Sequence, residues 1–372
     1  MTKPKKLILT AGPKVGKRDV AYVTDAAKNG WNFERSKYID LFESRFAKYL
    51  GVKYALTMPS GTSGLHLSLV LMGVGPGDEV IVPDFTYIAC ATAVRYTGAK
   101  PVLAEVNRET WSLDPNKLES YITKKTKAIM PVHLYGNLAD MDAIRVIAKK
   151  HHLFLVEDAC EGLGSTLQGK QAGAMSDAAS FSFQGAKLLA LGEGGMFVTS
   201  RKEWITRARS LIYQGISPTR QFWHNEIGFT YFMSNLQAAL GVARLEDMKD
   251  LIARKRRIFG WYKNRLGDIE GLQLNPERRG VVSSFWMSSI VLDRDFGITR
   301  DQLRGKLKEA MIDTRPFFYP ISEFGLYGKP LPKQHPVSYH LAHNGINLPS
   351  GVMLPEDTVD YIARTVRKIL QV

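Results

Sequence analysis

The sequence predicts an α/β protein: a large domain in which helices flank a mostly parallel sheet, followed by a smaller C-terminal α+β domain. From about residue 38 the chain alternates between segments of helical period and short runs rich in Val, Ile and Leu. This alternation is typical of helices that cover a parallel sheet. The length of 372 residues also exceeds what one hydrophobic core usually organises. We therefore expect a large domain over residues 1–245 and a small domain over residues 246–372.

The first elements follow from apolar spacing and turn residues. Residues 38–50 carry apolar side chains at Phe42, Phe46 and Leu50 and stop at Gly51, which predicts an amphipathic helix with a glycine C-cap. Short apolar runs predict buried strands. The runs in question are residues 53–58, 80–83, 101–106, 128–134 and 153–156.

Later elements carry clear start signals. Asp114 followed by Pro115 suits a helix start, because Asp caps the first turn and Pro is tolerated at the first helical position. A long charged helix is expected over residues 236–266, where the chain leaves the large domain. After it we expect a strand over residues 283–292 and a helix opened by a Thr-x-x-Gln capping box at residue 299.

Charge and cysteine content argue against several classes of protein. Lys and Arg number 50 against 36 Asp and Glu, but the basic clusters lie on helical segments without interleaved aromatic residues, so we expect no nucleic-acid binding. The basic N-terminus has an apolar run too short for a signal peptide or a membrane span, which favours a cytoplasmic protein without membrane contact. Cys90 and Cys160 form no Cys-x-x-Cys pair, and we expect no metal site.

Two short stretches carry candidate ligand-binding groups. The stretch SGTSG at residues 60–64 precedes a helix expected from about Leu65, and its backbone N–H groups and hydroxyls can hold a phosphate. An ordinary strand-to-helix turn has the same sequence features. The stretch VEDACE at residues 156–161 brings Asp158 to the carboxyl end of a strand, where ligands of α/β sheets lie. That carboxylate can keep a pyridine nitrogen protonated or simply cap a helix.

Two further stretches supply an amine and a ring. SFSFQGAK at residues 180–187 places Lys187 among apolar residues, where desolvation makes an amine able to attack a carbonyl; a snorkelling lysine is the simpler alternative. VPDFTY at residues 82–87 ends in Tyr87, whose ring can stack on a flat group or pack in the core. Together the four stretches supply a phosphate cradle, a stacking ring, a pyridine-nitrogen partner and a Schiff-base lysine, which are what pyridoxal phosphate requires.

At these residues the sequence resembles the sugar aminotransferases of the DegT, DnrJ, EryC and StrS family, within the fold type I pyridoxal-phosphate enzymes. The resemblance runs nearly end to end. Within the family the sequence is most similar to the GDP-perosamine synthase branch, whose acceptor is a 4-keto-6-deoxy sugar nucleotide. The matching stretches are SGT from Ser60, GDEVIVPDFTY ending at Tyr87, PVHLYGNLADMDAI from Pro131, VEDACEGLGS from Val156, FSFQGAKLLALGEGGM from Phe181 and TRPFFYP from Thr314.

The resemblance implies a role for each matched residue. Lys187 would form the Schiff base and carry protons, while Asp158 would pair with the pyridine nitrogen. Tyr87 would stack on the cofactor ring, and Glu161 would lie near its ring oxygen. The residues implied to hold the phosphate are Gly61, Thr62 and Ser182, and those implied to bind substrate are His133, Arg315 and Tyr319. The family also implies a homodimer with active sites at the interface.

Two departures from the family pattern concern the cofactor and the substrate. The family segment G-Y/F-N-Y-R-M has an Asn and an Arg that reach the phosphate of the neighbouring subunit. Here it reads GFTYFM, with Thr230 and Phe232 at those two positions, which predicts weaker retention of the pyridoxamine form. GWNFER from Gly30 replaces a W-I/V-S-x-x-G stretch that lies by the substrate. Both departures point to an unusual acceptor.

The predicted reaction is a two-stage transamination. An amino donor, L-glutamate by resemblance, converts pyridoxal 5'-phosphate to pyridoxamine 5'-phosphate, which then aminates a keto sugar, expected to be a nucleotide-linked 4-keto-6-deoxyhexose. Such amino sugars occur in lipopolysaccharide O-antigens. Lys187 argues against the deoxygenating branch of the family, which has His at this position. Two alternatives stay open: a regulatory or sensor protein without turnover, and an aminotransferase for a keto sugar or cyclitol that carries no nucleotide.

Overall fold

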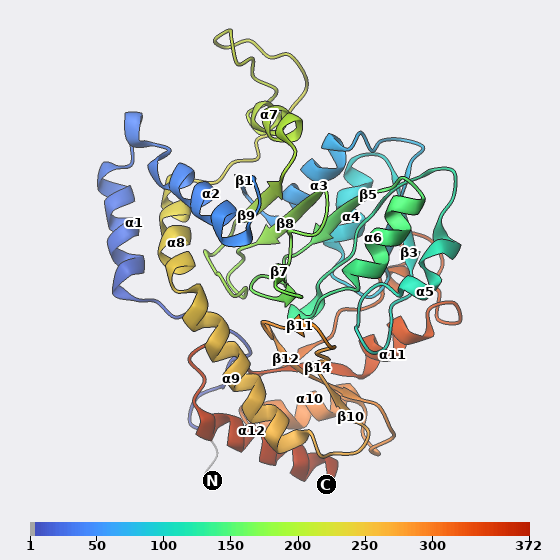
Figure 1. The fold of residues 1–372 in the computed structure, drawn as a ribbon. Coiled ribbons are helices and arrows are strands. Elements are labelled where there is room, and N and C mark those ends of the chain that lie inside the picture. The colour runs from blue at the N-terminus through green and yellow to red at the C-terminus, as the bar shows by residue number, and fades with distance from the viewer. Residues whose placement is uncertain (1–3) are drawn as a thin grey trace.

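A seven-stranded sheet forms the centre of the computed structural model, which describes residues 4–372 (Figure 1). Five neighbouring strands run parallel, and β9 runs antiparallel to both of its neighbours. The predicted mostly parallel sheet is therefore confirmed. In spatial order the strands are β1 (Tyr54–Met58), β9 (Gly195–Thr199), β8 (Ala178–Ser182), β5 (Phe154–Asp158), β4 (Thr126–Ile129), β2 (Glu79–Pro83) and β3 (Lys100–Ala104).

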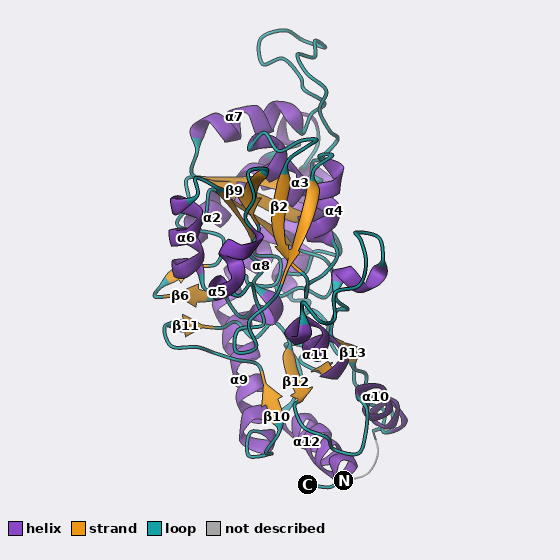
Figure 2. Ribbon diagram, turned by 90° about the vertical axis from the view of Figure 1, so that its right-hand side faces the viewer, coloured by secondary structure: helices purple, strands orange, loops and turns teal. Residues whose placement is uncertain are grey.

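Helices cover both faces of this sheet, with α3 and α4 on one face and α6 on the other (Figure 2). The sheet is consequently buried on both sides, as its apolar strands require. The α-helices of this part are α1 (Lys17–Asn29), α2 (Lys37–Leu50), α3 (Gly61–Leu71), α4 (Ala89–Tyr96), α5 (Pro115–Leu118), α6 (Met141–Lys150), α7 (Lys202–Leu211) and α8 (Asn235–Glu246). Short 3-10 helices are η1 (Asn32–Glu34), η2 (Glu119–Tyr121) and η3 (Leu134–Gly136).

The C-terminal part has its own antiparallel sheet and its own apolar cluster, built from residues 258–370. In spatial order its strands are β10 (Leu272–Leu274), β12 (Ser288–Leu292), β14 (Gly345–Leu348) and β13 (Arg315–Pro316). Its helices are α9 (Met248–Leu266), α10 (Arg300–Glu309), η4 (Ile321–Phe324), α11 (Pro336–Asn344) and α12 (Glu356–Leu370). A third small sheet joins β6 (Thr166–Leu167) to β7 (Lys170–Gln171) and β11 (Val281–Val282).

The predicted division between residues 245 and 246 stays a prediction. The N-terminal segment crosses it, because Ile8 forms a parallel bridge with Ile312 and the Thr10 N–H lies 3.2 Å from a carboxylate oxygen of Asp313. Among the described residues, none of the helices has the length and apolar character that a membrane span requires.

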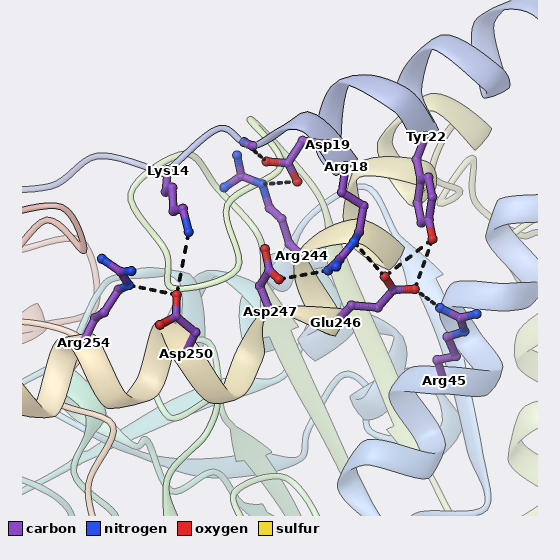
Figure 3. Close-up of polar contacts among 11 residues, drawn as sticks. Lys14, Arg18, Asp19, Tyr22, Arg45, Arg244, Glu246, Asp247, Asp250 and Arg254 are labelled. Carbon is purple, nitrogen blue, oxygen red and sulfur yellow. Dashed lines mark hydrogen bonds and ion pairs between the residues drawn. The ribbon is translucent and has the colours of Figure 1, made fainter.

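The single helix expected over residues 236–266 is two helices, so that prediction is wrong. Asp247 separates α8 from α9 and has φ −94° and ψ 2°. Arg18 of α1 pairs with Glu246 at 3.2 Å and with Asp247 at 2.9 Å, and Arg45 of α2 also pairs with Glu246 (Figure 3). These ion pairs connect the junction between α8 and α9 to α1 and α2. Hydrophobic periodicity does not predict such contacts, because they join segments that are distant in the sequence.

The strand expected over residues 283–292 begins later, at the start of β12. Serine hydroxyls take the N–H groups that a longer strand would need: Ser283 Oγ accepts from Phe285 at 3.0 Å, and Ser165 Oγ accepts from Ser284 at 2.8 Å. Such side-chain bonds compete with a strand ladder. The segment before β12 is consequently irregular, and its residue Trp286 lies at the candidate site.

Candidate active site

A cavity of about 410 Å³ lies at the carboxyl ends of the strands of the large sheet, where α/β sheets bind ligands. The loops after β1, β2, β5 and β8 form part of its wall, and Trp286 and Phe318 close it from the C-terminal part. Most residues predicted from the sequence line it together. These are Gly61, Thr62, Tyr87, Asp158, Glu161, Ser182, Lys187 and Arg315.

The predicted phosphate cradle is the first turn of α3, which starts at Gly61, a turn earlier than expected. Ser60 caps the helix, since its hydroxyl accepts the Ser63 N–H at 3.1 Å. A Cβ on Gly61 would lie 2.5 Å from Cys160 Sγ and 3.1 Å from Ser182 Cβ. Glycine therefore lets the helix start approach β8 closely, and the free N–H groups of this turn border the cavity.

Asp158 is buried at the end of β5 and faces the cavity. Its Oδ2 accepts the thiol S–H of Cys90 at 3.0 Å, and its Oδ1 accepts the backbone N–H of Cys160 at 3.0 Å. The next regular element along the chain is a strand, so the helix-cap alternative does not apply. The carboxylate is thus fixed in orientation by two donors and remains accessible to a ligand.

Lys187 meets Glu161 inside the cavity. The Lys187 side chain is 15% exposed, and its Nζ lies 3.1 Å from Glu161 Oε1. Glu161 Oε2 accepts the backbone N–H of Tyr135 at 2.9 Å. Burial raises the pKa of Glu161, and the neighbouring ammonium of Lys187 offsets only part of that effect. The pair therefore holds the Lys187 nitrogen at the cavity wall, beside a carboxylate that can accept its proton and so free the nucleophilic amine.

Sequence reasoning missed Trp286, the most direct aromatic contact of the lysine. The Trp286 ring centroid lies 4.0 Å from Lys187 Nζ, and the indole N–H donates to the Ala186 carbonyl at 2.8 Å. A tryptophan in the run SSFWMSS has no local feature that separates it from a core residue. Cys90 was likewise missed, because only the fold brings its thiol to Asp158. The cavity-lining residues Val132 and Phe318 were missed for the same reason.

His133 and Tyr319 do not lie on the cavity wall. His133 is fully buried, and its Nε2 is 2.8 Å from Glu157 Oε2. The Tyr319 hydroxyl lies 3.2 Å from Arg300 Nη2. Arg315, by contrast, does line the cavity. Substrate binding by the three residues stays a prediction.

Thr230 and Phe232 lie on the segment between α7 and α8, part of which projects from the body of the molecule (Figure 1). Phe232 is 45% exposed and stacks on Tyr213 with ring centroids 5.1 Å apart. The Thr230 hydroxyl accepts from the Gln214 side chain at 3.2 Å. Neither residue lines the cavity of its own chain.

The cavity fits pyridoxal phosphate in chemistry. The glycine-based start of α3 suits a phosphate, the buried carboxylate of Asp158 suits a protonated pyridine nitrogen, and Lys187 supplies the amine. Across residues 4–372, no three His, Cys, Asp or Glu side chains gather in a way that could hold a metal ion.

Comparisons with known proteins agree with this chemistry. Residues 13–367 match the DegT/DnrJ/EryC1/StrS aminotransferase family. Proteins named GDP-perosamine synthase from Escherichia coli O157:H7 and Caulobacter vibrioides are each 40% identical to this chain, over 98% of it and 98% of their own length.

A solved protein of Streptococcus pneumoniae, Spr1654, has the same fold. Its pyridoxal-phosphate form is 25% identical to this chain, with a TM-score of 0.92, and the match covers 98% of this chain and 99% of the Spr1654 chain. Its pyridoxamine-phosphate form matches with the same TM-score. The predicted fold, cofactor and family resemblance are confirmed. The chain is a pyridoxal-phosphate-dependent enzyme that belongs to the DegT/DnrJ/EryC1/StrS aminotransferase family.

Proposed function

We propose that this enzyme transfers the amino group of L-glutamate to a nucleotide-linked 4-keto-6-deoxyhexose and so forms a perosamine-like amino sugar. The observation that carries the proposal is the 40% identity, over 98% of both chains, to two proteins named GDP-perosamine synthase. A match of this extent includes the cavity and the segments around it. The product would serve polysaccharide synthesis, of the kind that builds a lipopolysaccharide O-antigen, and we place the enzyme in the cytoplasm.

Lys187 is the proposed catalytic amine. Pyridoxal phosphate supplies an aldehyde that condenses with amines and a ring that withdraws electrons from the carbon that loses its proton. Lys187 Nζ would bind that aldehyde covalently. After the amino donor displaces Lys187, its free amine would carry a proton from the Cα of the donor to the C4′ atom of the cofactor. Glu161, 3.1 Å away, would orient Nζ before the cofactor binds. It would afterwards lie near the ring oxygen.

The other wall residues would hold the cofactor in one orientation. Asp158 would keep the pyridine nitrogen protonated, because its carboxylate is buried and its two oxygens already accept from Cys90 and Cys160. Tyr87 would stack on the ring. The proposed phosphate ligands are Gly61, Thr62 and Ser182, which border the cavity at the ends of β1 and β8.

Arg315 is the best supported of the three proposed substrate ligands, since it lines the cavity and a guanidinium binds carboxylate and phosphate through paired hydrogen bonds. The donor carboxylate or the nucleotide phosphates would be its partner. His133 and Tyr319 would have to leave their present partners, Glu157 and Arg300, to reach a substrate.

We also propose a homodimer with shared active sites. The segment between α7 and α8 exposes large apolar side chains, with Ile227 at 94% and Phe222 at 84%. Exposed apolar groups concentrated on one projecting segment mark an interaction surface. A second subunit would bury them and would bring Thr230 and Phe232 towards the neighbouring cofactor.

The acceptor can be tested in the second half-reaction. The enzyme is loaded with pyridoxamine phosphate and mixed with a GDP-linked 4-keto-6-deoxyhexose, the same sugar without nucleotide, a keto cyclitol or a simple keto acid. Return of the aldehyde absorbance measures transfer, and we expect the highest kcat/KM for the nucleotide-linked sugar. Equal values with and without the nucleotide would favour the free sugar or cyclitol.

Turnover itself is tested on the donor side. Glutamate should convert the aldehyde form of the wild-type protein, and Lys187→Ala should abolish this change while the fold is retained. Borohydride reduction should fix the cofactor to the peptide that contains Lys187. Label on another lysine, or no spectral change with glutamate, would contradict the proposal and favour a regulatory protein without turnover.

A further inference from the structure

Lys255 is a buried amine that the proposed reaction does not use. It lies on α9, is 4% exposed, and donates from Nζ to the carbonyls of Trp286 at 2.5 Å and Ser350 at 2.6 Å. None of the ion pairs between described residues includes it. Burying a lysine without a carboxylate is costly, and a similar apolar side chain would be buried more cheaply. The two carbonyls therefore point to what the residue does.

One of those carbonyls belongs to the tryptophan that contacts the catalytic lysine. Trp286 touches the Lys187 segment twice, through its ring, centred 4.0 Å from Nζ, and through its indole N–H, which donates to the Ala186 carbonyl. A tryptophan face attracts an ammonium, and the indole bond fixes the backbone that carries it. Glu161 holds the same Nζ from its own side at 3.1 Å.

The segment that carries Trp286 is held in an uncommon conformation by α9. Phe285 has φ 46°, in the left-handed region that non-glycine residues seldom adopt. Its ring stacks on Phe259 of α9 with centroids 3.7 Å apart. Strained backbone of this kind persists where the surroundings fix it, and it concentrates at functional sites. Lys255 and Phe259 thus fix two consecutive residues from one helix face.

We infer that Lys255 is a positioning residue: it holds Trp286 against Lys187, and Trp286 in turn fixes the catalytic amine for covalent capture of the cofactor. A lysine side chain has four rotatable bonds, so an amine held from two sides loses less freedom when it reacts. The C-terminal part of the chain therefore completes a site whose nucleophile lies on the loop between β8 and β9 of the large sheet. This inference rests on the proposed covalent role of Lys187 and not on the identity of the sugar.

The test uses the full chain after removal of cofactor. Pyridoxal phosphate is added, the rate constant for covalent capture is followed by absorbance, and borohydride trapping assigns the link to Lys187. W286L should slow capture between about tenfold and a hundredfold, because small misplacements of a reacting group cost this much. W286F keeps an aromatic ring at this position, so its capture rate should decrease less than that of W286L.

Variants at Lys255 separate positioning from plain stability. K255M removes the donor and should slow capture in the same direction as W286L, whereas K255Q keeps an amide donor and should restore part of the rate. The double variant K255M/W286L should be no slower than W286L alone, since both changes act through one contact. In turnover, K255M should lower kcat with little change in the KM for glutamate.

Three outcomes would overturn the inference. K255M could capture cofactor at the wild-type rate while its thermal midpoint alone changes, which would make Lys255 purely structural. The reductions in capture rate caused by K255M and by W286L could multiply in the double variant, which would mean that the two residues act on Lys187 independently. If the K255M protein does not fold, the W286L variant alone tests the inference, and capture of the cofactor by W286L at the wild-type rate would overturn it. A wild-type protein that forms no borohydride-stable link at Lys187 would instead refute the proposed function, so the two failures are distinguishable.

Discussion

The buried amine of Lys255 should make the stability of this protein depend on pH in a way that Lys255→Met removes. Burial lowers the pKa of Lys255 from 10.5 to about 7. Between these two values the unfolded chain holds a proton that the folded chain has released, so the free energy of unfolding rises with pH across this window. Below pH 7 the full cost of burying the ammonium is present, and above 10.5 it is gone.

The size of the effect follows from the two pKa values. At 1.36 kcal/mol per pKa unit, the difference between 10.5 and about 7 corresponds to about 5 kcal/mol. About 3 kcal/mol of this falls between pH 6 and pH 9.5, a range suited to urea unfolding. The methionine variant has no titrating group at this position, so its stability relative to wild type should decrease by about 3 kcal/mol from pH 6 to pH 9.5.

The assay compares cofactor-free wild type, Lys255→Met and Lys255→Gln by urea unfolding at both pH values. The comparison cancels other groups that titrate, because they are common to the three proteins. The glutamine variant is also uncharged and should follow the methionine variant in its pH dependence, whatever its absolute stability. A stability difference that is the same at both pH values would refute the reasoning, since it would mean that Lys255 keeps its proton and the two carbonyls stabilise the ammonium.

Three further predictions concern the site itself. Asp158→Asn should still bind cofactor but lower kcat at least about a hundredfold, measured in the glutamate half-reaction, because a neutral amide does not stabilise a protonated ring nitrogen; near-normal turnover would remove Asp158 from the site. Gly61→Ala should lower the free energy of unfolding by about 1–3 kcal/mol, because its Cβ would lie 2.5 Å from Cys160 Sγ, and adding Cys160→Ala should restore part of it. Phe232→Arg should slow the loss of the pyridoxamine form during dialysis after glutamate treatment; an unchanged loss would show that residue 232 does not reach a phosphate.

Much of the site could be predicted because the chemistry lies in short stretches that follow strands. Gly61, Asp158 and Lys187 are far apart in the chain, yet the stretches that carry them each follow a strand of the large sheet. The carboxyl ends of parallel strands meet at one edge of a sheet, so once the alternation of helix and strand predicts such a sheet, the convergence of these stretches follows. The sequence by itself therefore determined the fold class, the cofactor chemistry and eight of the eighteen residues that line the cavity.

Only the tertiary structure decided the contacts that join segments distant in sequence. Periodicity shows that residues 236–266 are helical, but it does not show the break at Asp247, where arginines of α1 and α2 pair with Glu246 and Asp247. The sequence does not show that His133 is fully buried against Glu157, because the two side chains meet only when their elements pack. Trp286 reaches Lys187 because Lys255 and the stacked ring of Phe285 hold its backbone there. Local patterns encode which face of an element is apolar, whereas the partner that each polar or aromatic side chain meets is fixed only when the elements pack.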